Sequence, residues 1–72
     1  MRPIYQVRRE NWSPYTGNTQ ETVFETTRKR EAEKYINSLA KNYNKDGFVV
    51  WVREGYFQVP EFDCEYFICK KA

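Results

Sequence analysis

The sequence predicts an α+β fold, a two-layer sandwich in which one amphipathic helix packs on one face of an antiparallel sheet of four to five strands. Two observations lead to it. One segment repeats its apolar residues with helical spacing, and the β-prone segments around it give the order β-β-α-β-β-β along the chain. The 72 residues form a single small domain, 1–72, near the lower limit for folding on a hydrophobic core alone.

The N-terminal part predicts two strands separated by a long polar loop. The strands are expected over residues 4–9 and 22–26, and Pro3 stands at a strand start, where proline is tolerated. The loop, residues 11–21, is rich in turn-forming residues. It also carries two large aromatic residues, Trp12 and Tyr15, which suit a contact surface better than a simple connection.

The helix is predicted over residues 28–43. Its apolar residues follow i, i+3, i+4, i+7 spacing over three turns: Ala32, Tyr35, Ile36, Leu39, Ala40 and Tyr43. Thr27 is the expected N-cap, because a hydroxyl at that position accepts a hydrogen bond from a free backbone N–H. Gly47 is the expected stop, since glycine adopts positive φ readily.

The C-terminal part predicts three strands, over residues 48–53, 56–59 and 63–70. Glu54-Gly55 forms the first connection, and Pro60 ends the second strand. In the first strand both faces are apolar, with Phe48, Val50 and Val52 on one and Val49 and Trp51 on the other. The last strand alternates, with Phe62, Cys64, Tyr66 and Ile68 on one face and Glu61, Asp63, Glu65, Phe67, Cys69 and Lys71 on the other.

The composition argues against an enzyme. The chain has no histidine, which removes the commonest general base and every Ser–His or Cys–His nucleophile pair. Three scattered glycines form no phosphate loop, and two cysteines without histidine form no zinc site. Cys64 lies between two acids, which disfavours a thiolate. We therefore expect no catalytic residues and no cofactor.

The remaining metal-binding and cysteine chemistry also points to structural roles. Glu61, Asp63 and Glu65 recur at every second position, and a flat strand presents such a row poorly to a cation. We therefore expect no metal. Cys64 and Cys69 are an odd number of positions apart, so on one strand they point to opposite faces and do not pair.

Location and charge restrict the class of partner. No segment is long and apolar enough to span a membrane, and the N-terminus lacks the apolar run of a signal peptide. The expected location is therefore the cytoplasm, either of the protein's own cell or of a host. The net charge of +2 is mixed in sign and lower than a dedicated nucleic-acid binder usually carries.

The surplus of aromatic residues predicts a contact surface on the sheet face that the helix leaves open. Its expected members are Trp51, Tyr56 and Phe67, with Trp12 and Tyr15 from the loop. Three alternatives for covering this face stay open: a different protein, a second copy of the chain in a homodimer, or the 11–21 loop itself.

A second candidate surface is basic. Arg28, Lys29 and Arg30 stand in the first turn of the predicted helix, where cations oppose the helix dipole and free N–H groups favour an anion. Arg8, Arg9 and the tail Lys70-Lys71 extend this anion site if the fold brings them near. The alternative is a solvated basic turn that Glu31 and Glu33 offset.

We interpret the chain as a small non-catalytic protein–protein interaction module, an adaptor or inhibitor of a size typical of virus- or mobile-element-encoded proteins. It would bind through the aromatic sheet face and the basic helix start. The alternative is a nucleic-acid-binding protein that stacks bases on the sheet aromatics and holds phosphates at Arg28–Arg30. The acidic row Glu61/Asp63/Glu65 favours a protein partner, because it would repel a phosphate backbone on the same face.

Overall fold

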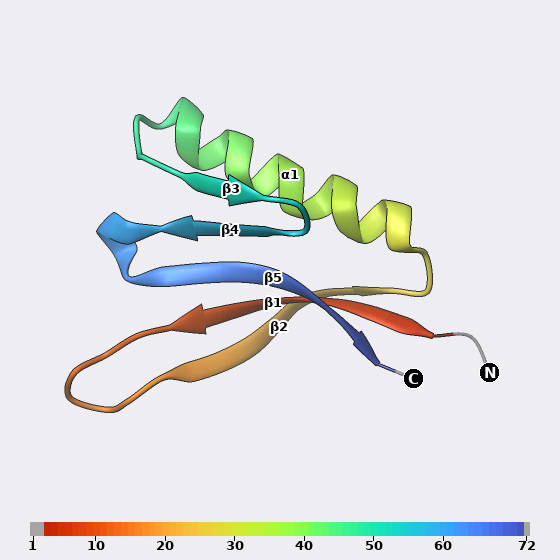
Figure 1. Ribbon diagram of the computed structural model, residues 1–72, viewed down its shortest axis with the longest axis horizontal. Helices are drawn as coiled ribbons and strands as arrows, with labels where there is room; N and C mark the ends of the chain where they lie inside the picture. Colours follow the sequence, from red (N-terminus) through yellow and green to blue (C-terminus); the bar gives the residue numbers. More distant parts are fainter. Residues whose placement is uncertain (1–2, 72) are drawn as a thin grey trace.

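The computed structural model describes residues 3–71 as a single sheet with one helix against it (Figure 1). The elements are β1 (Ile4–Asn11), β2 (Thr19–Thr26), α1 (Lys29–Lys45), β3 (Trp51–Arg53), β4 (Tyr56–Val59), a 3-10 turn η1 (Pro60–Phe62) and β5 (Cys64–Lys71). The five strands are arranged in the order β2-β1-β5-β4-β3, and all neighbours are antiparallel. The predicted α+β sandwich and its β-β-α-β-β-β order are confirmed.

The helix packs on the sheet through a narrow stripe of small and branched residues. Ala32, Ile36 and Ala40 are buried on it. The predicted N-cap is wrong, because the capping position is Arg28 and its side chain makes no capping hydrogen bond. The hydroxyl of Thr26 instead accepts the Arg28 backbone N–H at 3.1 Å. The predicted stop holds, since Gly47 follows the helix with φ of 91°.

The core lies between α1 and the three central strands. Its fully buried strand residues are Val7, Phe57, Val59 and Cys64, with Tyr66 4% exposed. The rings of Phe57 and Tyr66 stack with centroids 4.7 Å apart and planes within 14°. Tyr43 from α1 closes the cluster, because its hydroxyl lies 2.9 Å from that of Tyr66 and so satisfies both groups.

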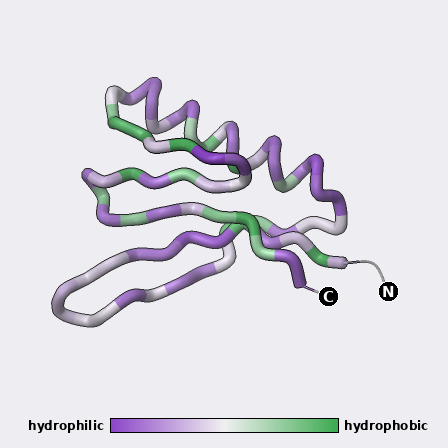
Figure 2. The backbone as a smooth tube through the Cα atoms, viewed as in Figure 1, coloured by the Kyte–Doolittle hydropathy of each residue, from purple (hydrophilic) through white to green (hydrophobic). Residues whose placement is uncertain are grey.

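The long loop predicted over residues 11–21 is largely strand. Both β1 and β2 extend further than expected, because their backbones keep pairing as far as Asn11 and Thr19. The connection 12–18 projects away from α1 (Figure 1) and carries little apolar character (Figure 2). Tyr15 is 94% exposed at its tip. Tyr15 therefore does not cover the open sheet face, whereas the half-buried Trp12 donates its indole N–H to Glu10 at the end of β1.

The acidic row predicted on the last strand is also wrong. Glu61 belongs to η1, and Asp63 occupies the left-handed region with φ of 51°. A left-handed residue breaks strand alternation, so β5 starts only at Cys64 and Glu65 alone remains on its face. Phe62 belongs to η1 rather than to β5, but its ring still packs on the helix side, 5.8 Å from that of Tyr43 and 4.7 Å from that of Phe48.

The first C-terminal strand is shorter than predicted. The expected strand over residues 48–53 reduces to Trp51–Arg53, because pairing with β4 begins only at Trp51. Phe48 and Val50 pack against the core from the connecting segment. Within residues 3–71, no helix combines the length and apolar character needed to cross a membrane.

Candidate binding face

The sheet face opposite α1, here called the open face, is defined by strand alternation. Residues that pair across neighbouring strands point to the same side, and Val7, Tyr66 and Phe57 point to the helix. The residues between them therefore form the open face. Its central members are Arg8, Glu10, Glu65, Phe67, Tyr56, Gln58, Trp51 and Arg53.

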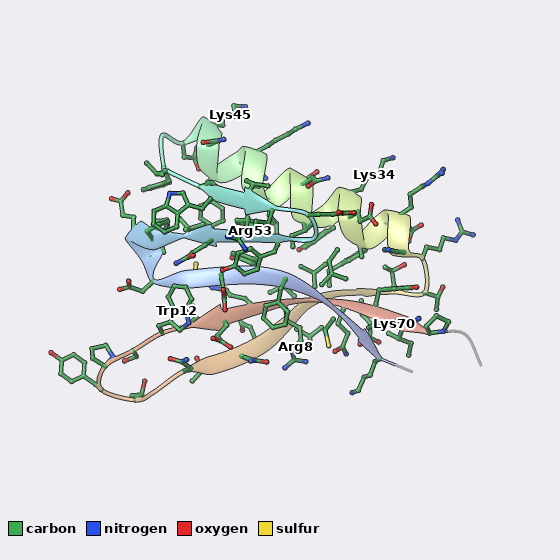
Figure 3. All side chains as sticks on the ribbon, in the orientation of Figure 1. Arg8, Trp12, Lys34, Lys45, Arg53 and Lys70 are labelled. Carbon is green, nitrogen blue, oxygen red and sulfur yellow. The ribbon has the colours of Figure 1, made fainter. Side chains whose placement is uncertain are left out.

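A row of alternating charge and aromatic character crosses the open face. Arg8 pairs with Phe67, Phe67 with Tyr56, and Tyr56 with Arg53. Strands are about 4.8 Å apart, so the two guanidinium-bearing residues stand about 14 Å from each other with two rings between them. Figure 3 labels Arg8 and Arg53 on the side of the sheet turned to the viewer. We call these four residues the cation–aromatic row.

The two arginines of this row have no carboxylate partner among the described residues. In residues 3–71 the one oppositely charged pair within 4.0 Å is Arg28–Glu31. Nη1 of Arg8 donates instead to neutral oxygens, Oε1 of Gln6 at 3.2 Å and Oγ1 of Thr22 at 2.9 Å. Both guanidinium charges therefore remain available to an anionic group of a partner.

Two carboxylates stand beside the row. Glu10 of β1 pairs directly with Glu65 of β5, although like charges opposite each other destabilise a sheet. Neutral donors compensate: Glu10 accepts Nε1 of Trp12 at 3.0 Å and Nε2 of Gln20 at 2.6 Å. Glu65 accepts the hydroxyl of Tyr56. The open face therefore carries both signs of charge around its rings.

The Tyr56–Glu65 contact changes the acidity of the phenol. The hydrogen bond to Glu65, followed by partial burial and the negative charge of that carboxylate, raises the pKa of Tyr56 to about 12. The Tyr56 hydroxyl therefore stays protonated and donates to Glu65 over the whole physiological pH range.

The aromatic residues predicted for the contact surface separate into three positions. Tyr56 and Phe67 are half-buried at the centre of the open face, and Trp51 is 59% exposed at its β3 edge. Trp12 lies half-buried where β1 ends, and its backbone N–H donates to the carbonyl of Asp63 at 2.9 Å. Tyr15 stands apart from all of them at the hairpin tip.

The predicted anion site is not assembled as one patch. Arg28, Lys29 and Arg30 are exposed at the start of α1. Arg8 lies on the opposite face of the sheet. Arg9 faces the helix side, but it does not join the helix start. Its guanidinium carbon lies 5.7 Å from the ring centre of the buried Tyr66.

Of the tail lysines, Lys70 does approach the helix start. It lines a groove of about 410 Å³ together with Lys29, Tyr5, Ile68 and two acids, Glu33 and Glu54. Because the groove carries both signs of charge, it lacks the purely basic character that the sequence suggested.

The cysteines occupy opposite faces, as predicted from their odd spacing. Both are free, Cys64 buried beneath α1 and Cys69 partly exposed on the open face. Burial raises the pKa of the Cys64 thiol, so it is a poor nucleophile at neutral pH. No cluster of three or more potential metal-binding side chains occurs between residues 3 and 71.

Two features of the open face were missed by the sequence reasoning: the position of Arg53 on it, and the pairing of Glu10 with Glu65. Alternation along 51–53 places Arg53 beside Trp51, so this signal was available locally. The Glu10–Glu65 pair depends on which strands become neighbours and had no local signal. Comparisons of the chain with protein-family models, curated proteins and solved structures give no match.

Proposed function

We propose that this chain is a small non-catalytic protein-binding module, an adaptor or inhibitor that acts in the cytoplasm of its own cell or of a host. It contacts its partner through the open face. The cation–aromatic row carries this proposal, because it combines two rings with two guanidinium groups that have no carboxylate partner within residues 3–71. Aromatic and arginine side chains are the types most enriched among residues that dominate protein–protein binding energy.

A protein fits this face better than a nucleic acid does. The acids Glu10 and Glu65 lie next to the rings, where a phosphate backbone would pass. A protein surface matches mixed charges with charges of its own, and interfaces of this kind have polar rims around apolar centres. The pair Glu10 and Glu65, rather than the predicted row Glu61/Asp63/Glu65, is therefore the acidic feature that favours a protein over a nucleic acid.

Nucleic-acid binding is the second candidate, and the two unpaired arginines favour it. A single strand stacked on Phe67 and Tyr56 would gain about 1–3 kcal/mol per base. Phosphates would then lie against Arg8 and Arg53, or against the helix start at Arg28–Arg30. Affinity of this kind falls steeply with salt.

The test compares both candidates on the same variants. A pull-down from the source cell, read by mass spectrometry, uses the wild type, Phe67→Ala and Tyr15→Ala. We expect a partner that is retained by Tyr15→Ala and lost with Phe67→Ala, since truncating a central ring of an interface costs about 2 kcal/mol or more.

A gel-shift assay with a random single-stranded oligonucleotide at micromolar protein concentration tests the second candidate, nucleic-acid binding. A shift that moderate salt abolishes, and that replacement of Arg28, Lys29 and Arg30 by Glu removes, would establish nucleic acid as the ligand and overturn the protein-binding proposal.

A further inference from the structure

The β3 edge of the sheet is exposed and apolar. β3 is last in the strand order and pairs with β4 alone. Trp51 is 59% and Val52 57% exposed, and Val49 just before them is 64% exposed. The opposite edge, β2, is polar along its exposed half, residues 19–22. Proteins normally protect sheet edges with short strands, charge, proline or a covering element. β3 is only three residues long and carries Arg53, but the exposed Val49, Trp51 and Val52 leave apolar surface along this edge that a partner can cover.

The backbone of Val52 faces outward from this edge. The carbonyl of Gly55 accepts a hydrogen bond from the N–H of Ile68 at 3.1 Å, so this backbone carbonyl points toward β5. Backbone groups alternate in direction along a strand, so Tyr56 is directed toward β3 and closes the two-residue turn with Arg53. By the same alternation the N–H and C=O of Val52 point away from β4, toward any strand added at the edge.

Grooves flank β3 on both faces of the sheet. The helix-side groove has a volume of about 330 Å³ and is lined by Glu33, Ile36 and Asn37 of α1 together with Val52, Arg53, Glu54 and Gly55. The groove on the open face has a volume of about 520 Å³ and is lined by Trp51, Val52, Arg53, Tyr56 and Gln58. Successive side chains of an added strand point to opposite faces, so they would enter the two grooves in turn.

The chemistry of these grooves selects the occupant. On the open face Arg53 has no carboxylate within 4.0 Å among the described residues and lies beside the indole of Trp51. It therefore favours an acidic side chain. On the helix side Val52 and Ile36 favour an apolar side chain, and the acids Glu33 and Glu54 of the same groove disfavour an acidic one. A second copy of β3, antiparallel about Val52, would instead place Arg53 against Trp51 of the other chain and leave both guanidinium groups without an acid.

We propose that the β3 edge binds an extended segment of the partner protein as a sixth strand, with an acidic side chain over Arg53 and an apolar neighbour in the groove beside Ile36. Main-chain hydrogen bonds to Val52 supply affinity, and the two grooves supply sequence preference. This inference rests on the proposed protein-binding function and specifies how the partner is held.

The test uses a displayed library of random linear ten-residue peptides selected on the wild-type chain. We expect enriched peptides in which acidic and apolar residues alternate. The strongest of them is synthesised and its dissociation constant measured by fluorescence polarisation on wild type, Val52→Pro, Val52→Thr and Arg53→Glu. Proline removes the outward N–H, and edge strands tolerate it where that N–H faces solvent. Threonine keeps the N–H and the β-branched shape.

Val52→Pro and Arg53→Glu should each weaken binding at least about tenfold, while Val52→Thr stays within about threefold of wild type. Hydrogen exchange at the Val52 amide should slow when the peptide binds, which tests the same contact in the unmutated chain. Circular dichroism establishes whether Val52→Pro is folded; if it is not, exchange at Val52 and the Arg53→Glu result decide.

Three outcomes would overturn the inference: no enrichment of alternating acidic and apolar peptides, equal binding by the folded Val52→Pro variant, or an unprotected Val52 amide in the complex. Light scattering that shows a dimer sensitive to Val52→Pro would assign the edge to a second copy instead. A cellular partner lost with Phe67→Ala but retained by Val52→Pro would leave the proposed function standing and remove strand addition alone.

Discussion

Replacing Tyr56 with phenylalanine tests the central contact of the open face through its pH dependence. The hydroxyl of Tyr56 donates to the carboxylate of Glu65, which raises the pKa of the phenol from its ordinary value of 10 to about 12. Between these values the unfolded chain loses the Tyr56 proton while the folded chain keeps it. The unfolded state then binds fewer protons, so the free energy of unfolding falls as pH rises.

The magnitude follows from the shift and from the position of the ring. Two pKa units correspond to about 2.7 kcal/mol for a fully buried group. Tyr56 and Glu65 are only half-buried, and solvent screening reduces the contribution to about 1 kcal/mol. The same contribution is present at pH 7, where a domain of this size has a total stability of about 3–5 kcal/mol.

Urea unfolding followed by circular dichroism measures this contribution. At pH 8 we expect Tyr56→Phe to be less stable than wild type by about 1 kcal/mol, and the gap to close as pH rises from 10 to about 12. Burial also raises the pKa of Tyr66, but Tyr66 is present in both proteins and its contribution cancels. Tyr15→Phe, at the exposed hairpin tip, is the matched control and should leave the curve unchanged.

A double-mutant cycle assigns the effect to its partner. With Glu65→Gln as background, the Tyr56 substitution should cost less, because the charged acceptor of the Tyr56 hydroxyl is gone. If the difference in the free energy of unfolding between wild type and Tyr56→Phe stays constant from pH 8 to pH 12, the hydrogen bond to Glu65 does not stabilise the folded chain and the prediction is wrong.

Three further predictions concern the core, the thiols and the helix start. Phe57→Ala removes a fully buried ring at a cost of about 3–5 kcal/mol, which equals the expected total stability, so the variant should show no cooperative thermal transition; a sharp transition would contradict the core assignment. In the native protein a thiol reagent should modify Cys69 well before Cys64, and denaturant should equalise the two rates; equal native rates would show that α1 does not shield Cys64. Replacing Lys29 and Arg30 by Glu should raise stability by a few tenths of a kcal/mol per residue in low salt, because acids suit a helix start, whereas Arg28 is kept because it pairs with Glu31; a loss of stability would show that these cations make contacts that the fold needs.

Local periodicity was enough to predict the elements and their faces. The apolar spacing from Ala32 to Tyr43 predicts the helix, since one stripe must face the sheet, and Ile36 is indeed buried. Alternation predicts that Tyr66 and Phe67 point to opposite faces of β5, and this is what the structure has. These properties depend on residues only a few positions apart in the chain, so they can be predicted from the local sequence.

Element boundaries were predicted less well, because pairing overrides composition. Residues 19–21 are polar and resemble a loop, yet they continue β2 because β1 offers them hydrogen-bond partners. Asp63 occupies the left-handed region where alternation predicted strand, and this removed the expected acidic row. Single-residue backbone conformations of this kind leave only a weak trace in composition.

The arrangement of the candidate site was decided by the tertiary structure alone. β5 inserts between β1 and β4, although β1 is remote from both in the chain, and only this order brings Arg8, Phe67, Tyr56 and Arg53 into one row. The same order opposes Glu10 and Glu65 and leaves β3 at an open edge. A strand's own residues determine which face each side chain takes, but neighbours across the sheet are chosen by the packing of the whole domain.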